Sequence, residues 1–338
     1  MKKSLVKASI KYSWPGWISH SAVAFLDKSL SSGHLNHAYI FSGPNDLGKS
    51  VAARQFAANL MLSPGTSASE LERSADFHVI TRESGKKNIS IDQIRELIRV
   101  LGLSAFGDSY KVAIIKEAEL LSESAANALL KILEEPRDKV VIILLVNHAE
   151  LLLKTLLSRG QLVRFSPVSF DTVYDYLLRE RKASPSLAKN LARLASGRPV
   201  MALNFLEDQD YYQNYLNVAK IFLNFFSQDF SARLAGIKKL ISEIDKDDDD
   251  KVLVSKEDVL DIWQSVARDL LLFNLDHRDL LRFEALREEI AKISYNLDNP
   301  RFWRRRILFI QEQLRYLRAN VSFKNVLENI AANICDII

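Results

Sequence analysis

A glycine-rich stretch, GPNDLGKS, has the G-x-x-x-x-G-K-[ST] spacing of a phosphate-binding loop. In such a loop Gly43 and Gly48 let backbone N–H groups close around phosphate oxygens, Lys49 reaches the β- and γ-phosphates, and Ser50 ligates magnesium. An apolar run, HAYIFS, precedes the motif and an amphipathic stretch follows it, which is the strand–loop–helix context that the motif requires. The sequence therefore predicts a site for the phosphates of ATP or ADP.

The acid that should accompany this loop is absent from its expected position. A P-loop hydrolase holds magnesium with the loop Ser or Thr and with an acid at the end of a neighbouring strand. In KVAIIKEAELL the strand closes at Ile115, and Lys116 stands at the acid position. An ammonium group there repels magnesium, so we expect no metal site and weak or absent hydrolysis, with Glu117 a vestige of the water-polarising acid. The alternative is a solvated Lys116 that faces away from the phosphates.

Short apolar runs alternate with amphipathic stretches between residues 37 and 167, which is typical of parallel βαβ units with helices covering the sheet. A segment rich in Ser, Gly, Pro and Thr, residues 63–75, is expected to be a surface loop. The expected strands are 37–43, 76–80, 111–115 and 140–146, and the expected helices are 49–62, 91–101 and 122–135.

Strand signals disappear after Asp171, and the rest of the chain has helical periodicity. We therefore expect an α/β domain at residues 1–167, a small helical domain at 168–208 and a larger helical domain at 209–338. An acidic run, SEIDKDDDDK at residues 242–251, is expected to be a solvated loop between helices.

Composition excludes several classes of protein. A chain of 338 residues is long enough for more than one core, and its 48% hydrophobic and 26% charged residues are ordinary for globular proteins. No apolar run has the length of a membrane span, so we expect a cytoplasmic protein without membrane contact. Its one cysteine, Cys335, excludes an intramolecular disulfide and a cysteine-rich zinc site. The net charge of +4 is a weak indication of nucleic-acid contact.

Four segments together resemble the clamp-loader branch of the AAA+ ATPases, and within it the delta-prime class of bacterial DNA polymerase III. They are HAYIFSGPNDLGKS, ISIDQIRELIRVL, KVAIIKEAELLSESAANALLKILEEP and LLSRG, in this order. The resemblance is strong over residues 35–165, moderate to residue 206 and limited to length and helical character beyond that. It implies a RecA-like AAA+ domain, a helical lid and a helical collar that joins subunits into a ring.

The resemblance also implies roles for single residues. Asn147 falls on the polar sensor of the γ-phosphate, and Arg159 on the arginine finger that acts on a neighbour's ATP. Gly160 replaces the cysteine of the family's Ser-Arg-Cys motif. Val200 stands where active loader ATPases carry a second sensing arginine, unless Arg198 has taken that role. The family's zinc-binding cysteines are missing as well, so we expect no zinc.

By resemblance, the chain is a structural, finger-donating subunit of a loader that opens a sliding clamp and places it on primed DNA. Its expected partners are loader subunits of the gamma/tau and delta types, with the clamp and the DNA reached through the complex. Two alternatives remain open: an active gamma/tau-type loader ATPase, and another AAA+ motor such as a branch-migration helicase subunit.

A basic segment near the C-terminus raises a separate question of DNA contact. Residues 301–324 hold seven basic residues and one acid, Glu312. Apolar residues with helical spacing, from Trp303 to Leu317, are expected on one face, and the arginines on the opposite or flanking faces. A DNA-facing stripe fits this pattern, and a solvated helix of the collar domain fits it better.

Overall fold

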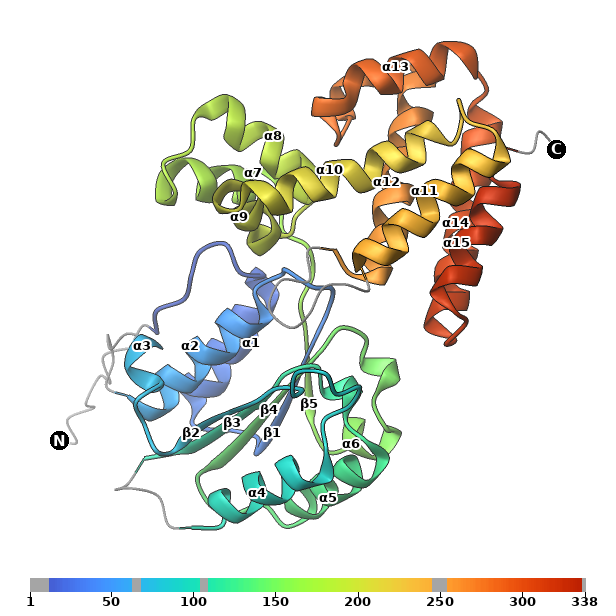
Figure 1. Cartoon of the computed structure of the whole chain (residues 1–338). Helices are drawn as coiled ribbons and strands as arrows, with labels where there is room; N and C mark the ends of the chain where they lie inside the picture. The colour runs from blue at the N-terminus through green and yellow to red at the C-terminus, as the bar shows by residue number, and fades with distance from the viewer. Residues whose placement is uncertain (1–11, 63–67, 104–108, 245–253, 336–338) are drawn as a thin grey trace. The chain divides into compact units, whose positions relative to one another are not determined.

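The computed structural model describes residues 12–62, 68–103, 109–244 and 254–335 (Figure 1). The chain divides into two compact units, one made of residues 1–176 and 197–201, the other of residues 177–196 and 202–338. The three-domain division expected from the sequence stays a prediction. Most of the acidic run at residues 242–251 lies outside the described residues.

The first unit is built on a parallel sheet of five strands in the order β2-β3-β4-β1-β5. Strands β3 and β4 are buried along their whole length, as expected where helices cover both faces of a parallel sheet. The strands are β1 (Ala38–Ser42), β2 (Phe77–Ile80), β3 (Lys111–Ile115), β4 (Val140–Val146) and β5 (Gln161–Arg164).

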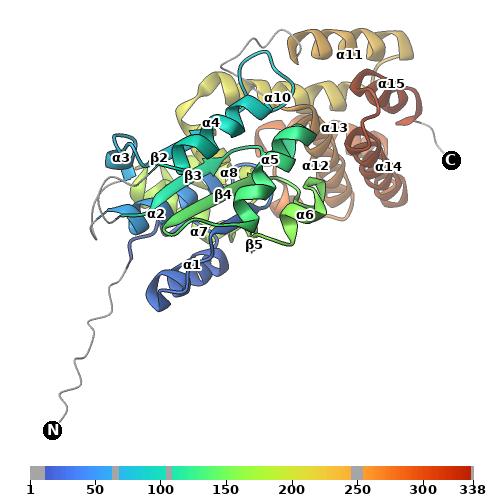
Figure 2. The ribbon, with the colours of Figure 1, turned by 90° about the horizontal axis from the view of Figure 1, so that it is seen from below.

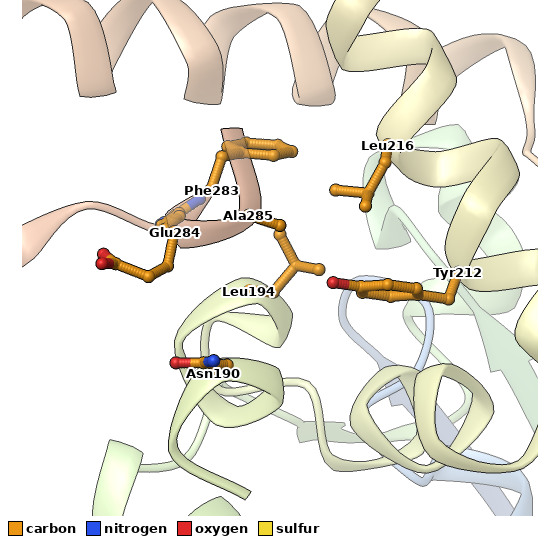
Figure 3. A pocket seen from close by; sticks show the side chains of 8 residues that line it. Asn190, Leu194, Tyr212, Leu216, Phe283, Glu284 and Ala285 are labelled. Atoms are coloured by element: carbon orange, nitrogen blue, oxygen red, sulfur yellow. The ribbon is translucent and has the colours of Figure 1, made fainter. Parts of the chain in front are cut away.

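Helices lie on both faces of this sheet (Figure 1). On one face the ring of Phe56, from α2, packs edge-on against Tyr39 of β1, with 5.0 Å between ring centroids. On the other face α4 and α5 cover alternate strand residues such as Ile40 and Ile142, and Figure 2 looks on to that face. The helices of this unit are α1 (His20–Ser32), α2 (Lys49–Met61), α3 (Ala68–Leu71), α4 (Ile91–Leu101), α5 (Glu123–Glu134), α6 (Lys154–Leu157) and α7 (Phe170–Asp175).

Local sequence signals fix where several of these helices begin. A capping box starts α4, because the Gln93 N–H donates to Ser90 Oγ at 3.3 Å and the Ser90 N–H donates to Gln93 Oε1 at 3.0 Å. Ser122 caps α5 in the same way through the Ala125 N–H. The short helix α3 falls inside the segment expected to be a loop, and α1 was not among the expected helices.

The second unit is helical. Trp263 lies at the centre of its core, and the indole N–H donates to Val218 O at 2.9 Å, which satisfies its one polar atom. The helices are α8 (Pro185–Ala195), α10 (Gln209–Asn224), α11 (Phe230–Ile244), α12 (Lys256–Asn274), α13 (Arg287–Asn296), α14 (Pro300–Arg318) and α15 (Phe323–Asn333), while α9 (Pro199–Glu207) is divided between the two units. A parallel α/β sheet followed by helices confirms the predicted fold class.

The basic helix α14 departs from the expected pattern at one residue. Arg306 is buried rather than on the outer face: its guanidinium donates to Asn333 O at 2.6 Å and lies 4.8 Å from the centre of the Phe302 ring. It follows Trp303 by one helical turn, which places it on the face that packs inward. Arg301, Arg304 and Arg315 are exposed, as expected. Within the described ranges, no helix combines the length and apolar character needed to cross a bilayer.

Candidate functional site

The phosphate loop lies between the end of β1 and the start of α2. Gly48 immediately precedes the helix and has φ +85°, a conformation that favours glycine because it lacks a Cβ. The first N–H groups of α2 have no acceptor inside the helix and are therefore directed at the loop. The strand–loop–helix arrangement predicted for Gly43 to Ser50 is thus present.

The side chain of Lys49 folds back on to the loop. Its ammonium donates to Gly43 O, to Pro44 O at 2.8 Å and to Asn147 Oδ1 at 2.9 Å, so all three of its N–H groups have acceptors. Burial lowers the pKa of Lys49 to about 8, although the nearby carboxylates of Glu119 and Asp46 partly oppose that shift. The amine is therefore still largely protonated at neutral pH and able to meet an anion.

Asn147, the residue expected at the sensor position, joins the loop to the neighbouring strand. It directly follows β4, which pairs with β1, so the carboxyl ends of the two strands place it beside Lys49. The structure thus brings together the phosphate-loop residues and Asn147, which lie about a hundred positions apart in the sequence.

Glu119 is a residue of this site that the sequence pattern did not reveal. The Asn147 N–H donates to its Oε1 at 2.9 Å, and its Oε2 is buried with no hydrogen-bond partner among the described residues. Burial raises the pKa of Glu119, and the Asn147 N–H and the Lys49 ammonium partly offset that rise. Lys49, Asn147 and Glu119 therefore form one connected polar chain.

Glu117, the predicted vestige of the water-polarising acid, faces Arg82. Glu117 has φ +49°, its side chain is about half exposed, and its carboxylate lies 4.0 Å from Arg82 Nε. The left-handed residue at 117 turns the chain into a short 3-10 helix, Ala118–Leu120, and this turn carries Glu119 toward the loop. The only sequence signal for the place of Glu119 in the site was that it is a second acid two residues after Glu117. Lys116 follows the last residue of β3, and its backbone N–H donates to Ile80 O at 2.9 Å.

Arg159 lies away from the loop. It follows α6 and precedes β5, which runs parallel to β1 with Gln161 level with Tyr39. Arg159 is thus level with residue 37, at the amino end of the strands, whereas the phosphate loop begins at Gly43, at their carboxyl end. Six residues of extended strand separate these two positions, which corresponds to roughly 20 Å. Its guanidinium donates to Glu134 Oε1 at 2.6 Å and, through the other terminal nitrogen, to Thr155 O at 3.3 Å.

Close packing against Ile40 explains why position 160 holds glycine and not the cysteine of the family's motif. A Cβ at this position would lie 2.6 Å from Ile40 Cδ1 and 2.7 Å from its Cγ1. The isoleucine therefore fills the space that a larger residue at position 160 would need, and the neighbouring arginine is unaffected.

Comparison with known proteins finds subunits of DNA polymerase III among the similar proteins. Residues 18–169 match the family model described as "DNA polymerase III, delta subunit". The chain is 25% identical to DNA polymerase III subunit delta' of Bacillus subtilis over 90% of its own length and 92% of that protein. It is 28% identical to DNA polymerase III subunit gamma of Buchnera aphidicola over 55% of each chain, so it spans about half of that relative.

A solved structure is also similar. The gamma subunit-related protein of Thermotoga maritima aligns with 91% of this chain and 98% of its own, with a TM-score of 0.48 and 20% sequence identity. The family model matches less than half of the chain, and relatives named delta' occur in several bacteria. Over residues 18–169 the chain is thus similar to DNA polymerase III subunits of the clamp-loader type.

Proposed function

We propose that this chain is the delta-prime-type subunit of a bacterial sliding-clamp loader. In this role it donates Arg159 to ATP held by a neighbouring subunit and turns over little or no ATP itself. Its partners are then loader subunits of the gamma/tau and delta types, and the clamp and primed DNA are reached through the assembled complex in the cytoplasm. Relatives named delta', one of them covered over 92% of its length, support this proposal.

The observation that carries the proposal is the placement of Arg159. Arg159 lies at the amino end of the strands and the phosphate loop of the same chain at their carboxyl end, so Arg159 is too far away to act on a nucleotide in that loop. A guanidinium is always charged and forks two hydrogen bonds on to phosphate oxygens, which suits it to stabilise charge developing on a γ-phosphate. One terminal nitrogen of Arg159 donates to Glu134 Oε1 at 2.6 Å.

The residues around the loop fit a phosphate group and do not fit the metal that hydrolysis needs. The first turn of α2 and the side-chain amide of Asn147 offer donors to phosphate oxygens, and Lys49 adds a positive charge beside them. The position of the magnesium-binding acid is filled by Lys116, so we derive no metal-assisted step in this chain. Purified chain is therefore expected to hydrolyse ATP at or near background.

A second candidate is an active gamma/tau-type ATPase subunit. It is favoured by the polar chain of Lys49, Asn147 and Glu119, because a buried carboxylate close to the loop could serve where Lys116 does not. Substantial ATP turnover by the isolated chain that is abolished by Lys49→Ala would favour this candidate over the first.

The test is Arg159→Ala in the reconstituted loader. A finger supplied from another protein contributes on the order of a thousandfold or more at the site it serves. Since only one of several sites loses its finger, we expect a partial loss of ATP turnover and of clamp loading, with assembly intact by size-exclusion chromatography.

Glu134→Gln is the matched control for this test. It removes the ion-pair partner of Arg159, a half-exposed pair worth on the order of 0–1 kcal/mol, and leaves the guanidinium in place. Normal loading with Arg159→Ala would rule out the finger. Equal loss of assembly in both variants would show that the ion pair is structural.

A further inference from the structure

Trp17 occupies the space that the second glycine of the phosphate loop leaves open. A glycine is used at such a position because the backbone must come close to a ligand. At Gly48 a Cβ would lie 2.6 Å from Cζ3 and 3.3 Å from Cη2 of Trp17. The six-membered ring of the indole therefore rests directly on the Gly48 backbone, on the side of the loop that the glycine clears.

This indole is a packed group and not a platform for stacking. A tryptophan that stacks on a base keeps one ring face open, whereas Trp17 is only 8% exposed. Its ring packs against Tyr176, which is 3% exposed, with 5.1 Å between the centroids and 40° between the planes. A turn closed by the Ile18 N–H and Pro15 O at 3.2 Å fixes the backbone on either side of it.

The phosphate-binding side chains of the loop come from elements other than the Trp17 segment. Lys49 and Asn147 reach the loop from α2 and from the end of β4, and Gly48 is the loop residue against which Trp17 packs. The tip of the loop is tied down separately, because the Val200 N–H donates to Asp46 O at 3.1 Å. The obstruction therefore lies beside the phosphate cradle and not within it.

We propose that Trp17, backed by Tyr176, is a specificity-determining plug that keeps nucleosides out of the phosphate loop. A group attached to phosphate at this loop must pass over Gly48, and the indole fills that space. The proposal rests on the proposed function only in treating the loop as a phosphate cradle. It makes Trp17 a steric barrier to nucleotide that is separate from the charge defect at Lys116.

Calorimetry on the full chain tests this with two probes, ADP and tripolyphosphate, which has phosphates and no nucleoside. In Trp17→Val we expect ADP to gain about tenfold or more in affinity and tripolyphosphate to change by less than about twofold. Adding Lys49→Ala to Trp17→Val should remove the gain if ADP binds at the loop. Trp14→Val is the matched control, because Trp14 lies in the same segment and donates to Asp27 instead.

Three results would overturn the plug: wild-type chain that binds ADP as tightly as the Trp17 variant, an equal gain for tripolyphosphate, or the same gain in Trp14→Val. Loss of a buried indole is destabilising, so thermal denaturation accompanies each titration and Trp17→Leu serves as a milder second variant. The loading assay with Arg159→Ala does not depend on this loop, so failure of the plug and failure of the finger are distinguishable.

Discussion

Lys49 and Glu119 are connected through Asn147 in one buried site, and each shifts the pKa of the other. Burial disfavours the ammonium form of Lys49, while the Glu119 carboxylate favours it. The folded pKa of about 8 lies below the ordinary value of 10.5, so charging Lys49 opposes folding. That penalty on the free energy of unfolding is complete below about pH 8 and disappears as the pH rises to 10.5.

The first prediction concerns the titration of Lys49. In chain labelled with ¹³C at lysine Cε, NMR should give a midpoint near 8 for Lys49, and Glu119→Gln should move it lower because a favourable negative charge is lost. Glu117→Gln is the matched control, since Glu117 is half exposed and pairs with Arg82. A midpoint near 10.5, or equal shifts in both variants, would contradict the arrangement.

At the scale of elements, the close contact between α6, β5 and β1 constrains position 160. Gly160→Ala places a methyl group against Ile40 and should destabilise the chain by about 1–3 kcal/mol, the usual range for overpacking. Adding Ile40→Val to Gly160→Ala should recover part of the lost free energy of unfolding. Thermal denaturation of the two single variants and the double variant measures this as a departure from additivity.

Gly236→Ala supplies the control for this second prediction. Gly236 lies inside α11, and a Cβ there meets nothing within 4 Å. Alanine should therefore stabilise that helix by about 0.5–1 kcal/mol. Equal effects of alanine at positions 160 and 236 would mean that Ile40 does not fill the space beside Gly160.

The elements themselves were largely predictable from the sequence. The apolar runs at 111–115 and 140–146 coincide with β3 and β4, because strands buried on both faces leave an unbroken apolar signal. Helix α1 was missed because its apolar positions are interrupted by small and polar residues and its N-cap side chain makes no hydrogen bond. Ser90 and Gln93, by contrast, mark the start of α4 in the sequence alone.

The site was predictable only in part. Lys49 follows from a motif, which is a local signal, whereas Asn147 was named only through the resemblance to a family. Glu119 depends on the left-handed conformation of Glu117, and Trp17 on a contact with Gly48 some thirty residues away. No pattern of residue types predicts the left-handed conformation of Glu117 or the contact between Trp17 and Gly48.

At the scale of the whole molecule, the two proposals place separate obstacles between this chain and ATP, the charge of Lys116 and the bulk of Trp17. Lys116→Asp alone should leave the affinity for Mg-ADP little changed, because the indole remains. The double variant Trp17→Val/Lys116→Asp should bind Mg-ADP more tightly than either single variant and should show a dependence on magnesium that Trp17→Val lacks. Calorimetry with and without magnesium measures this coupling, and a full gain from Lys116→Asp alone would make the charge the only obstacle.

The separation of Arg159 from the phosphate loop across the sheet gives the molecule a polarity. A two-fold symmetric contact brings the same end of the sheet together in both chains, so the arginine of one chain does not reach the phosphate loop of the other. Only a head-to-tail contact brings the arginine of one chain to the phosphate loop of the next. A chain with these two groups at opposite ends of its sheet is a directional unit, so in a head-to-tail assembly every such chain would face the same way.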